Sequence, residues 1–385
     1  MIPNFNFSFQ FHFNYLTFLF SFYLNYVILN LNRFLDQSCK EEAPMIYDFS
    51  LDDYTQKKLK QRTEAFHNLI NKKINTDIYL LSDFGPSRKI HMLHSGLGIG
   101  MALAFNNDNY FPLLDFGLPC GISVFRVFPN ISISNIIRKL EEFSKTGEII
   151  MSGNHFISIA EESNNSLYII VHYENHDDIA LLYKRFLNHA ISISDNINNM
   201  TINYLEGINV KNYIRSYFEI QKGYFSEQRK VANRIFEDIF DKTICTSLHR
   251  GIVKYKKQLF LLNGCQISNS PLISTIPHGG VVICKNKGCM NERFIFPHGF
   301  GNKFNGLINV NYKKDKIVIN NRKFIIGENK LFDSSIISLR ENDENRYQRY
   351  LQAVLNNSKV EKDIELFELC EFNKNGFWKD KKYEC

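Results

Sequence analysis

The stretch GEIIMSGNHFISIAEESNNSLYIIVHYE, residues 147–174, decides the fold because it contains two apolar runs of strand length. The residues between the runs, Asn164 and Asn165 above all, favour a tight turn. We therefore predict a strand, a turn and a second strand that ends at His172. A sheet built from this hairpin would place His155 and His172 at one of its edges.

Helical and strand-like patterns alternate on both sides of this hairpin. Apolar residues recur at helical spacing in five segments, which we predict to be helices: residues 52–75, 132–145, 178–193, 205–240 and 338–357. The segment 205–240 is the longest. The segment YFPLLDFGLPCGISVFRVF, residues 110–128, predicts a strand, a turn containing Cys120 and another strand. Short strands interrupted by glycine are expected from 251 to 320. Such a mixture predicts one mixed α/β domain that covers residues 45–385.

The first 44 residues differ from the rest of the chain. FNFSFQFHFNY alternates aromatic and polar residues, and YLTFLFSFYLNYVILNL is nearly apolar. The basic start and the small residues near the end that a signal peptide needs are both missing. A membrane anchor fits the length. The alternative that we favour is translated upstream sequence ahead of a true start at Met45. We therefore expect no stable membrane contact unless this hydrophobic extension is real.

Composition is that of a protein with a large core and a modest positive charge. The 385 residues are 44% hydrophobic and carry a formal charge of +6, from Lys and Arg dispersed along the chain. This charge is compatible with binding a polyanion and equally with simple solubility. Eight cysteines without CxxC pairs indicate reduced thiols and a cytoplasmic protein. The long segment 205–240 has an aromatic and basic face, which we interpret as a solvated face over a buried aromatic stripe.

Five residues that bind divalent metals fall at predicted turns and strand ends: Cys120, His155, His172, His249 and His298. One thiolate with several imidazoles suits zinc, manganese or iron. His298 lies in PHGFGNK, residues 297–303, where Gly299 and Gly301 would let a ligand approach the backbone closely. A neutral imidazole held in such a turn is a competent nucleophile towards phosphorus.

The motifs around these residues resemble those of the RtcB-type RNA ligases in order and approximate spacing, from about Ile90 to Gly376. SGNHF is the strongest match, and HGFGNK is similar to the HGAGR loop of that family. The further motifs that carry the resemblance are Cys120 in its glycine-flanked turn, His172 at the end of IIVH, SLHRG (247–251), NGC (263–265), IPHGG (276–280) and the long aromatic helix. The resemblance implies a single large RtcB-like domain with mixed sheets and flanking helices.

The resemblance also implies an activity. Such enzymes use GTP and one or two manganese ions to join an RNA 3′-phosphate or 2′,3′-cyclic phosphate to a 5′-hydroxyl, in tRNA splicing or RNA repair. Carried over residue by residue, His298 would be the nucleophile that becomes guanylylated. The metal ligands would be Cys120, His155, His172 and His249. The nucleotide would be held by Asn154, His298, Gly299, Gly301 and Lys374, and the RNA by Lys and Arg around the site.

Several family positions are changed in this chain. The acidic ligand expected three residues before the cysteine is Gly117, the acidic residue after GNHF is Ser158, and His94 occupies the place of an aspartate. Arg250 follows His249 where asparagine is expected, and the arginine of HGAGR is missing unless Lys303 replaces it. Two alternatives to a ligase are therefore kept: a metal- and RNA-binding paralogue that does not ligate, and a metal-dependent cyclic phosphoesterase.

Overall fold

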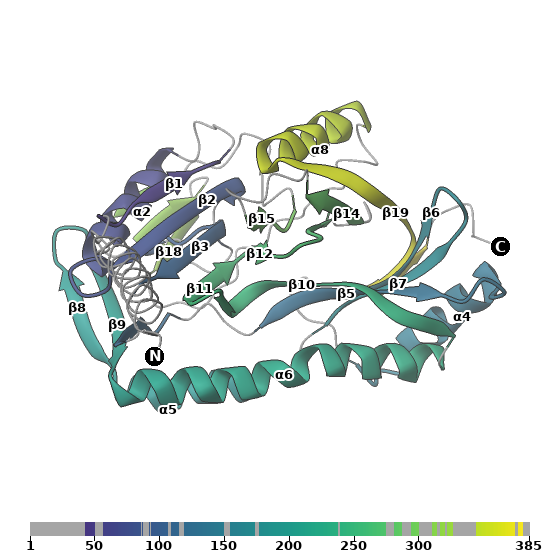
Figure 1. Cartoon of the computed structure of the whole chain (residues 1–385), viewed down its shortest axis with the longest axis horizontal. Helices are drawn as coiled ribbons and strands as arrows, with labels where there is room; N and C mark the ends of the chain where they lie inside the picture. The colour runs from purple at the N-terminus through teal and green to yellow at the C-terminus, as the bar shows by residue number, and fades with distance from the viewer. Residues whose placement is uncertain are drawn as a thin grey trace, which may run out of the picture. The chain divides into compact units, whose positions relative to one another are not determined.

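The computed structural model describes residues 43–50, 57–85, 87, 92, 94–106, 109–114, 119–149, 155–173, 177–237, 239–274, 281–286, 294–299, 310–313, 316–319, 322–325, 344–373 and 376–379. The chain divides into two compact units, Met1–Pro44 and Met45–Cys385. The predicted extension lies almost wholly outside the described residues. The second unit has mixed α/β structure, which confirms the predicted fold class (Figure 1).

A twelve-stranded sheet forms the centre of the second unit. All its neighbouring strands are antiparallel except β1 and β2, which are parallel. The strand β20 (Gly376–Lys379) pairs with β19 outside the main path. The order across the main path is β1 (Ile46–Asp48), β2 (Thr76–Gly85), β3 (Ile99–Phe105), β11 (Gln258–Asn263), β10 (Phe240–Tyr255), β5 (Cys120–Val127), β7 (Leu167–His172), β6 (Phe156–Glu162), β19 (Val360–Asn373), β14 (Val281–Asn286) and β13 (Leu272–Ser274).

Three smaller sheets accompany the central one. The pair β12 (Cys265–Ile267) and β15 (Ile295–Pro297) matters most for the site, because β12 contacts β10 and β3 while β15 contacts β2. The other two sheets have the orders β4 (Tyr110–Pro112), β9 (Met200–Glu206), β8 (Ile191–Asp195) and β16 (Val310–Lys313), β17 (Lys316–Ile319), β18 (Arg322–Ile325).

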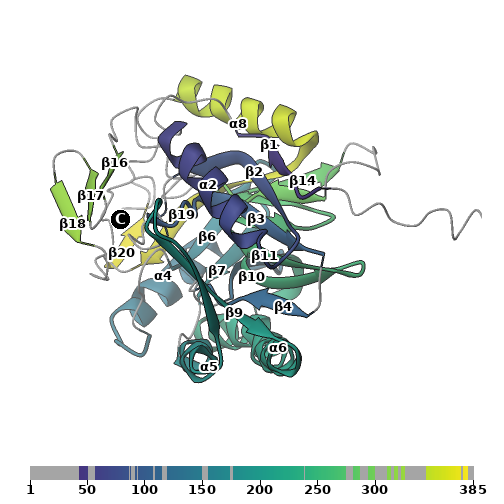
Figure 2. The same cartoon turned by 90° about the vertical axis from the view of Figure 1, so that its left-hand side faces the viewer.

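Five helices belong to the described residues: α2 (Lys57–Ile70), α4 (Ile133–Ser144), α5 (Asp177–Leu187), α6 (Ile208–Phe236) and α8 (Glu344–Ser358). Each overlaps a segment predicted to be helical. Figure 2 shows α5 and α6 nearly end-on below the strands, with α8 on the opposite side. No helix in this part of the chain combines the length and apolar character needed to cross a bilayer.

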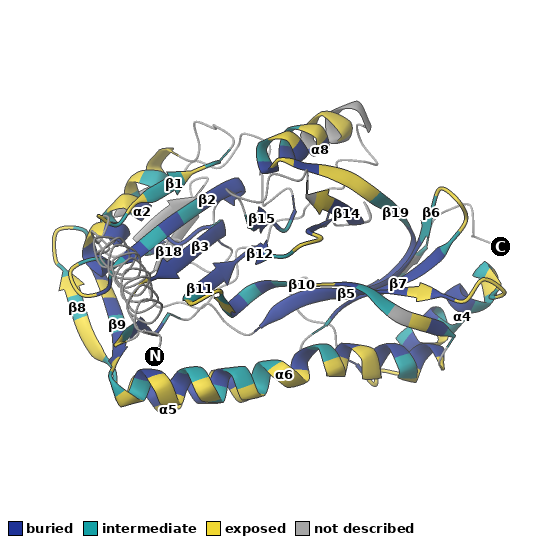
Figure 3. Ribbon diagram, viewed as in Figure 1, coloured by how far each residue is buried: buried dark blue, intermediate teal, exposed yellow. Residues whose placement is uncertain are grey.

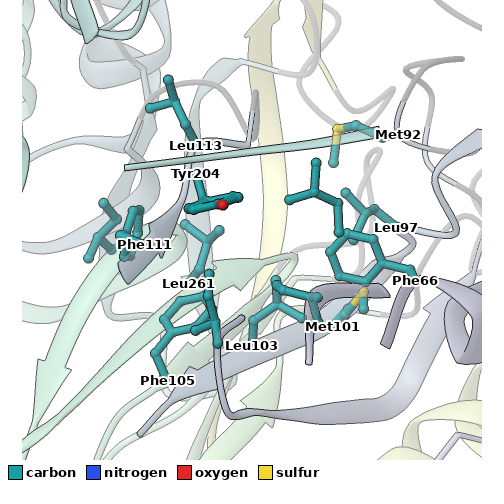
Figure 4. Close-up of a cluster of buried hydrophobic side chains, with 14 of the residues drawn as sticks. Phe66, Met92, Leu97, Met101, Leu103, Phe105, Phe111, Leu113, Tyr204 and Leu261 are labelled. Carbon is teal, nitrogen blue, oxygen red and sulfur yellow. The ribbon is translucent and has the colours of Figure 1, made fainter. Parts of the chain in front are cut away.

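The largest cluster of buried apolar side chains joins α2 to the strands β3, β4, β9 and β11 (Figure 4). Phe66 of α2, Leu103 of β3 and Tyr204 of β9 belong to it and are almost fully buried. A second cluster packs α4 and the end of α6 against β5, β6, β7 and β19. These two clusters fix α2 and α6 on the sheet and so set the position of the strands between them.

The long helix α6 shows how local residues set its limits. Gly207 precedes it with a φ of 58°, and Glu237 ends it in the left-handed conformation, with its N–H bonded to the carbonyl of Asn233. Its tyrosines Tyr213, Tyr217 and Tyr224 are buried, whereas much of the outer side is exposed (Figure 3). The structure therefore shows the buried aromatic stripe and solvated face that the sequence predicted.

The sequence prediction is wrong for residues 191–193, which form the first part of strand β8 and not the end of a helix. Helix α5 ends at Leu187, and β8 then pairs with β9 in register from Ile191 with Tyr204 to Asp195 with Met200. The turn between the strands is held by Asp195, which accepts hydrogen bonds from Ile197 and Asn198, and by Asn199 at a φ of 50°. Asparagine and aspartate suit such turns because their side chains bond nearby backbone.

Candidate metal centre

Three predicted metal ligands meet at one end of the central sheet. Cys120 begins β5, His172 ends β7, and His155 immediately precedes β6. Because β5, β7 and β6 are antiparallel neighbours, the start of one strand lies beside the end of the next. The possible ligand atoms of the three residues all lie within 4.8 Å of one another. The hairpin register explains this directly, since Phe156 pairs with His172.

The three side chains are buried and in contact. The sulfur of Cys120 lies 2.9 Å from Nε2 of His172. The rings of His155 and His172 are perpendicular, with centroids 5.2 Å apart. Buried polar groups this close need a shared partner or a proton between them, and one divalent ion would satisfy all three. One thiolate with imidazoles favours an ion of the manganese or zinc class over magnesium.

His249 extends this group towards His298. Its ring centroid lies 5.0 Å from that of His172 and 5.1 Å from that of His298. Its Nδ1 is buried and has no hydrogen-bond partner among the described residues. Burial, followed by the nearby His172 and His298, holds the pKa of His249 well below its ordinary value. The imidazole is therefore neutral, which is the form that binds a metal.

The position of His249 in its strand differs from the prediction. We expected it at a strand end, but it lies inside the 16-residue strand β10. The pairing of β10 with β5 shifts between Leu248, opposite Gly121, and Arg250, opposite Cys120. Such an irregularity redirects one side chain within an otherwise continuous strand. The shift in register points the side chain of His249 towards Cys120 and His172.

His298 follows β15 and is held by a carboxylate that the sequence analysis missed. Its Nδ1 lies 2.8 Å from Oδ2 of Asp83, and its backbone N–H donates to the same oxygen at 3.3 Å. Asp83 lies near the end of β2 and is fully buried, whereas the His298 side chain is 22% exposed. The ring therefore presents one nitrogen to Asp83 and keeps the other for a ligand. The sequence feature that pointed to Asp83 is an acidic residue inside the otherwise apolar strand segment LLSDFG.

Two glycines allow the loops around this pair to close. Gly264, from NGC, has a φ of 72°, and a Cβ there would lie 2.9 Å from the backbone nitrogen of Gly100 and 3.1 Å from Cε1 of His298. Gly100, from HSGLGIG, has a φ of 74° and packs against Asp83. Both conformations disfavour other residues. The two motifs therefore converge on the Asp83–His298 pair.

The loop containing His298 is also anchored on its other side. Gly299 forms an isolated parallel bridge with Ser274, and a Cβ on Gly299 would lie 2.6 Å from the Ser274 carbonyl oxygen. The backbone nitrogen of Ser274 donates to the carbonyl of His298 at 2.7 Å. These contacts require glycine at 299, and they fix the backbone on which His298 is carried.

Helix α6 braces the ligand-bearing strands from behind. The Tyr224 hydroxyl accepts from Gly121 N–H at 2.8 Å and lies 2.9 Å from the Gly121 carbonyl. The amide nitrogen of Gln228, which is fully buried, donates to the carbonyls of Gly121 at 2.9 Å and Tyr173 at 3.1 Å. Gly121 follows Cys120, and Tyr173 follows His172. These bonds therefore hold both ligand-bearing segments in place.

The residues at which this chain departs from the RtcB-type motifs have definite environments. Ser158 is fully buried, and its hydroxyl has no hydrogen-bond partner among the described residues. Arg250 donates from Nε to Oδ1 of Asn263 at 3.4 Å, and Asn263 bonds the Gly98 carbonyl at 2.5 Å. His94 lies against Arg62, with its Nε2 3.2 Å from the Arg62 guanidinium. The predicted nucleotide-binding residues Asn154, Gly301 and Lys374 lie outside the described residues, as do Gly117 and Lys303.

Comparison with known proteins adds no assignment, because no family model, no curated protein and no solved structure matches this chain. The site consists of four predicted ligands, one predicted nucleophile and Asp83. The chemistry open to it is that of a metal centre beside an oriented imidazole. Cys120, His155 and His172 could hold a metal, and the ring of His249 lies beside that of His172.

Proposed function

We propose that this chain is a GTP-dependent RNA ligase of the cytoplasm that joins an RNA 3′-phosphate or 2′,3′-cyclic phosphate to a 5′-hydroxyl. The observation that supports the proposal most is the Asp83–His298 pair next to the buried cysteine and histidine group. The choice of GTP and RNA comes from the resemblance of the motifs to those of RtcB-type ligases. Manganese, as one or two ions, is the proposed metal.

In this proposal Asp83 makes His298 a nucleophile. The carboxylate accepts a hydrogen bond from Nδ1–H, so the proton stays on Nδ1 and the lone pair of Nε2 is free to attack the α-phosphorus of GTP. The Nε2–P bond forms, the bond from the α-phosphorus to the bridging oxygen breaks, and pyrophosphate leaves. The imidazole becomes positively charged in this step, and the buried carboxylate stabilises that charge.

Two transfers complete the reaction. An oxygen of the RNA 3′-phosphate attacks the guanylylated histidine, so the N–P bond breaks and GMP passes to the RNA. The 5′-hydroxyl then attacks the RNA phosphorus, loses its proton and displaces GMP. A cyclic phosphate must first be opened by water to a 3′-phosphate. A bound metal ion would withdraw charge from the phosphate oxygens, which is the chemistry that such an ion supplies.

One observation favours a second function. The buried hydroxyl of Ser158 stands where the resembling motifs have a carboxylate, and such changes commonly lower activity about ten- to a hundredfold. A metal- and RNA-binding protein that does not ligate would keep the Cys120, His155, His172 and His249 group and lose the transfer steps. A metal-dependent phosphoesterase would use the same group to open cyclic phosphates without GTP.

The test is an RNA joining assay with residues 45–385, labelled RNA carrying 2′,3′-cyclic phosphate and 5′-hydroxyl ends, manganese, and GTP present or omitted. A ligase forms joined RNA only with GTP, and His298→Ala abolishes it. His189→Ala, in an exposed histidine after α5, is the matched control and should leave joining unchanged. Opened ends formed without GTP would replace the proposal with a phosphoesterase, and RNA bound without any product would replace it with a binding protein.

A further inference from the structure

Six side chains form a straight stripe along the outer flank of α6. They are spaced by four, three, four, three and four residues, which keeps them on one side of a helix. We name these residues the α6 stripe: Lys211, Arg215, Phe218, Lys222, Phe225 and Arg229. Over 18 residues the stripe is about 27 Å long at the rise of an α-helix. Figure 1 shows α6 running beneath β10, β5 and β7, and Figure 3 shows its outer side exposed.

The middle of the stripe borders a hollow. Arg215, Phe218, Lys222 and Phe225 line it together with Glu219 and Gln221, and its volume is about 580 Å³. Both phenylalanines are half-buried, with their rings packed beside the buried tyrosines Tyr217 and Tyr224. Oε1 of Gln221 is buried and has no hydrogen-bond partner among the described residues. The hollow thus combines ring surface with positive charge.

The charge on α6 is strongly unbalanced. The helix has six exposed basic residues and two exposed acidic residues. The basic residues are Lys211, Arg215, Lys222, Arg229, Lys230 and Arg234. Both acids already pair with lysines, Glu219 with Lys222 at 2.9 Å and Glu227 with Lys230 at 2.5 Å. Within the described residues the other four cations make no ion pair, although Arg229 donates to the Asp241 carbonyl. A helix with this surplus attracts a polyanion.

Gln221, which lines the hollow, also lies close to two segments that carry proposed metal ligands. A Cβ on Gly251 would lie 2.7 Å from the Tyr217 hydroxyl, 3.4 Å from Oε1 of Gln221 and 3.5 Å from Cα of Pro119. Pro119 immediately precedes Cys120, and Gly251 is two residues from His249.

We propose that the α6 stripe binds a single strand of RNA, with phosphates on its four cations and bases stacked on Phe218 and Phe225. Single-stranded nucleic acid is bound in this way by positive grooves with aromatic side chains. The choice of RNA rests on the proposed function, while the site itself rests on charge, ring surface and the hollow.

The test is fluorescence anisotropy of a short labelled single-stranded RNA with the full chain, without GTP. The double variant Arg215→Ala, Lys222→Ala should bind RNA at least about tenfold more weakly. The slope of log K against log salt concentration should become shallower by about 1.4, because each of the two lost phosphate contacts contributes about 0.7. The matched control is Lys230→Ala, Arg234→Ala, which removes the same charges from another side of the same helix. It should change binding less than about twofold.

Phe225→Leu separates stacking from charge and keeps an apolar side chain for packing. It should weaken binding about fivefold or more without changing the salt dependence, since a stacked base contributes about 1–3 kcal/mol. Melting temperatures within a few degrees of the unchanged protein would show that the variants are folded, and Phe225→Tyr should restore binding.

Equal losses in the two double variants, or binding of an acidic peptide as tight as that of RNA, would overturn the stripe as an RNA site. Covalent labelling by GTP is read separately. If labelling fails while the stripe variants weaken RNA binding, the proposed ligase is wrong and the stripe stands. If labelling succeeds while the variants bind RNA normally, the stripe is wrong and the ligase stands.

Discussion

His298 and Asp83 lie 215 residues apart in the chain, yet the position of the histidine depends on the aspartate. The carboxylate is fully buried and bonds both the ring and the backbone nitrogen of His298. A buried carboxylate that is paired in this way fixes the orientation and the protonated nitrogen of the imidazole. The ring nitrogen that His298 leaves for a ligand is therefore selected by a residue outside its own loop.

Asp83→Asn tests this role. The amide can still accept a hydrogen bond, but it lacks the charge that stabilises a positive imidazole, so we expect guanylylation of His298 to slow about ten- to a hundredfold. Single-turnover labelling with GTP measures the rate. Asp241→Asn, an exposed aspartate, is the control. An unchanged rate in Asp83→Asn, with the protein folded, would leave Asp83 with a structural role only.

His94 makes stability depend on pH. Burial, followed by the charge of Arg62, lowers the pKa of His94 from 6.5 to about 4. Between these values the unfolded chain binds a proton that the folded chain does not, so stability falls as the pH falls through this range. The fall stops below about pH 4, where both states are protonated.

We expect the free energy of unfolding to change with pH by about 2 kcal/mol less in His94→Asn than in the unchanged protein. One pKa unit corresponds to about 1.4 kcal/mol, and solvent partly screens the shift because the site is not fully closed. Urea unfolding at about pH 7 and about pH 5 gives the two free energies of unfolding. If the free energy of unfolding differs between the two pH values by the same amount in His94→Asn as in the unchanged protein, then His94 is not the cause of the pH dependence.

At the scale of elements, the hairpin β6–β7 could be predicted and the hairpin β8–β9 was not. Both have asparagine-rich turns, but the apolar runs of β6 and β7 are buried, whereas β8 is largely exposed and mixes serine with isoleucine. Its short run follows a helix without glycine or proline to end the helical pattern. Strands buried on both faces have continuous apolar sequences, so β6 and β7 could be recognised, whereas the exposed strand β8 lacks such a sequence.

Gln228→Leu tests the brace that α6 provides. Leucine fills a similar volume but cannot donate to the carbonyls of Gly121 and Tyr173, so the segments carrying Cys120 and His172 lose two of their supports. We expect metal affinity to fall about tenfold. Titration with a metal-sensitive dye measures it, with Arg234→Gln on the same helix as control. Unchanged affinity in a folded Gln228→Leu protein would show that the strands hold the ligands without α6.

At the scale of the whole molecule, the site is assembled from segments that are distant in sequence. Motif order indicated Cys120, His155, His172, His249 and His298 together, but only the sheet order shows which of them touch. The path β2, β3, β11, β10, β5, β7, β6 carries Asp83 at one side and His155 at the other, and the β12–β15 pair places His298 between them. The sequence shows Asp83 only as an acidic residue in an apolar strand, and its pairing with His298 could not be predicted because this topology alone sets it.

A bound metal should stabilise the entire fold, because its proposed ligands come from four strands or their edges. A metal that binds only the folded state at about a hundred times its Kd adds about 2.7 kcal/mol. We expect manganese or zinc to raise the melting temperature, a chelator to reverse the rise, and His172→Ala to abolish it. An equal rise in His172→Ala would place the metal elsewhere.

Covalent labelling by GTP tests the central claim most directly. Protein incubated with manganese and α-labelled GTP is separated on a denaturing gel, and the modified residue is located by peptide mass spectrometry. The account predicts one GMP on His298, with labelling lost in His298→Ala and slowed in Asp83→Asn. Metal binding by the unchanged protein without any label, or a label that persists in His298→Ala, would contradict it.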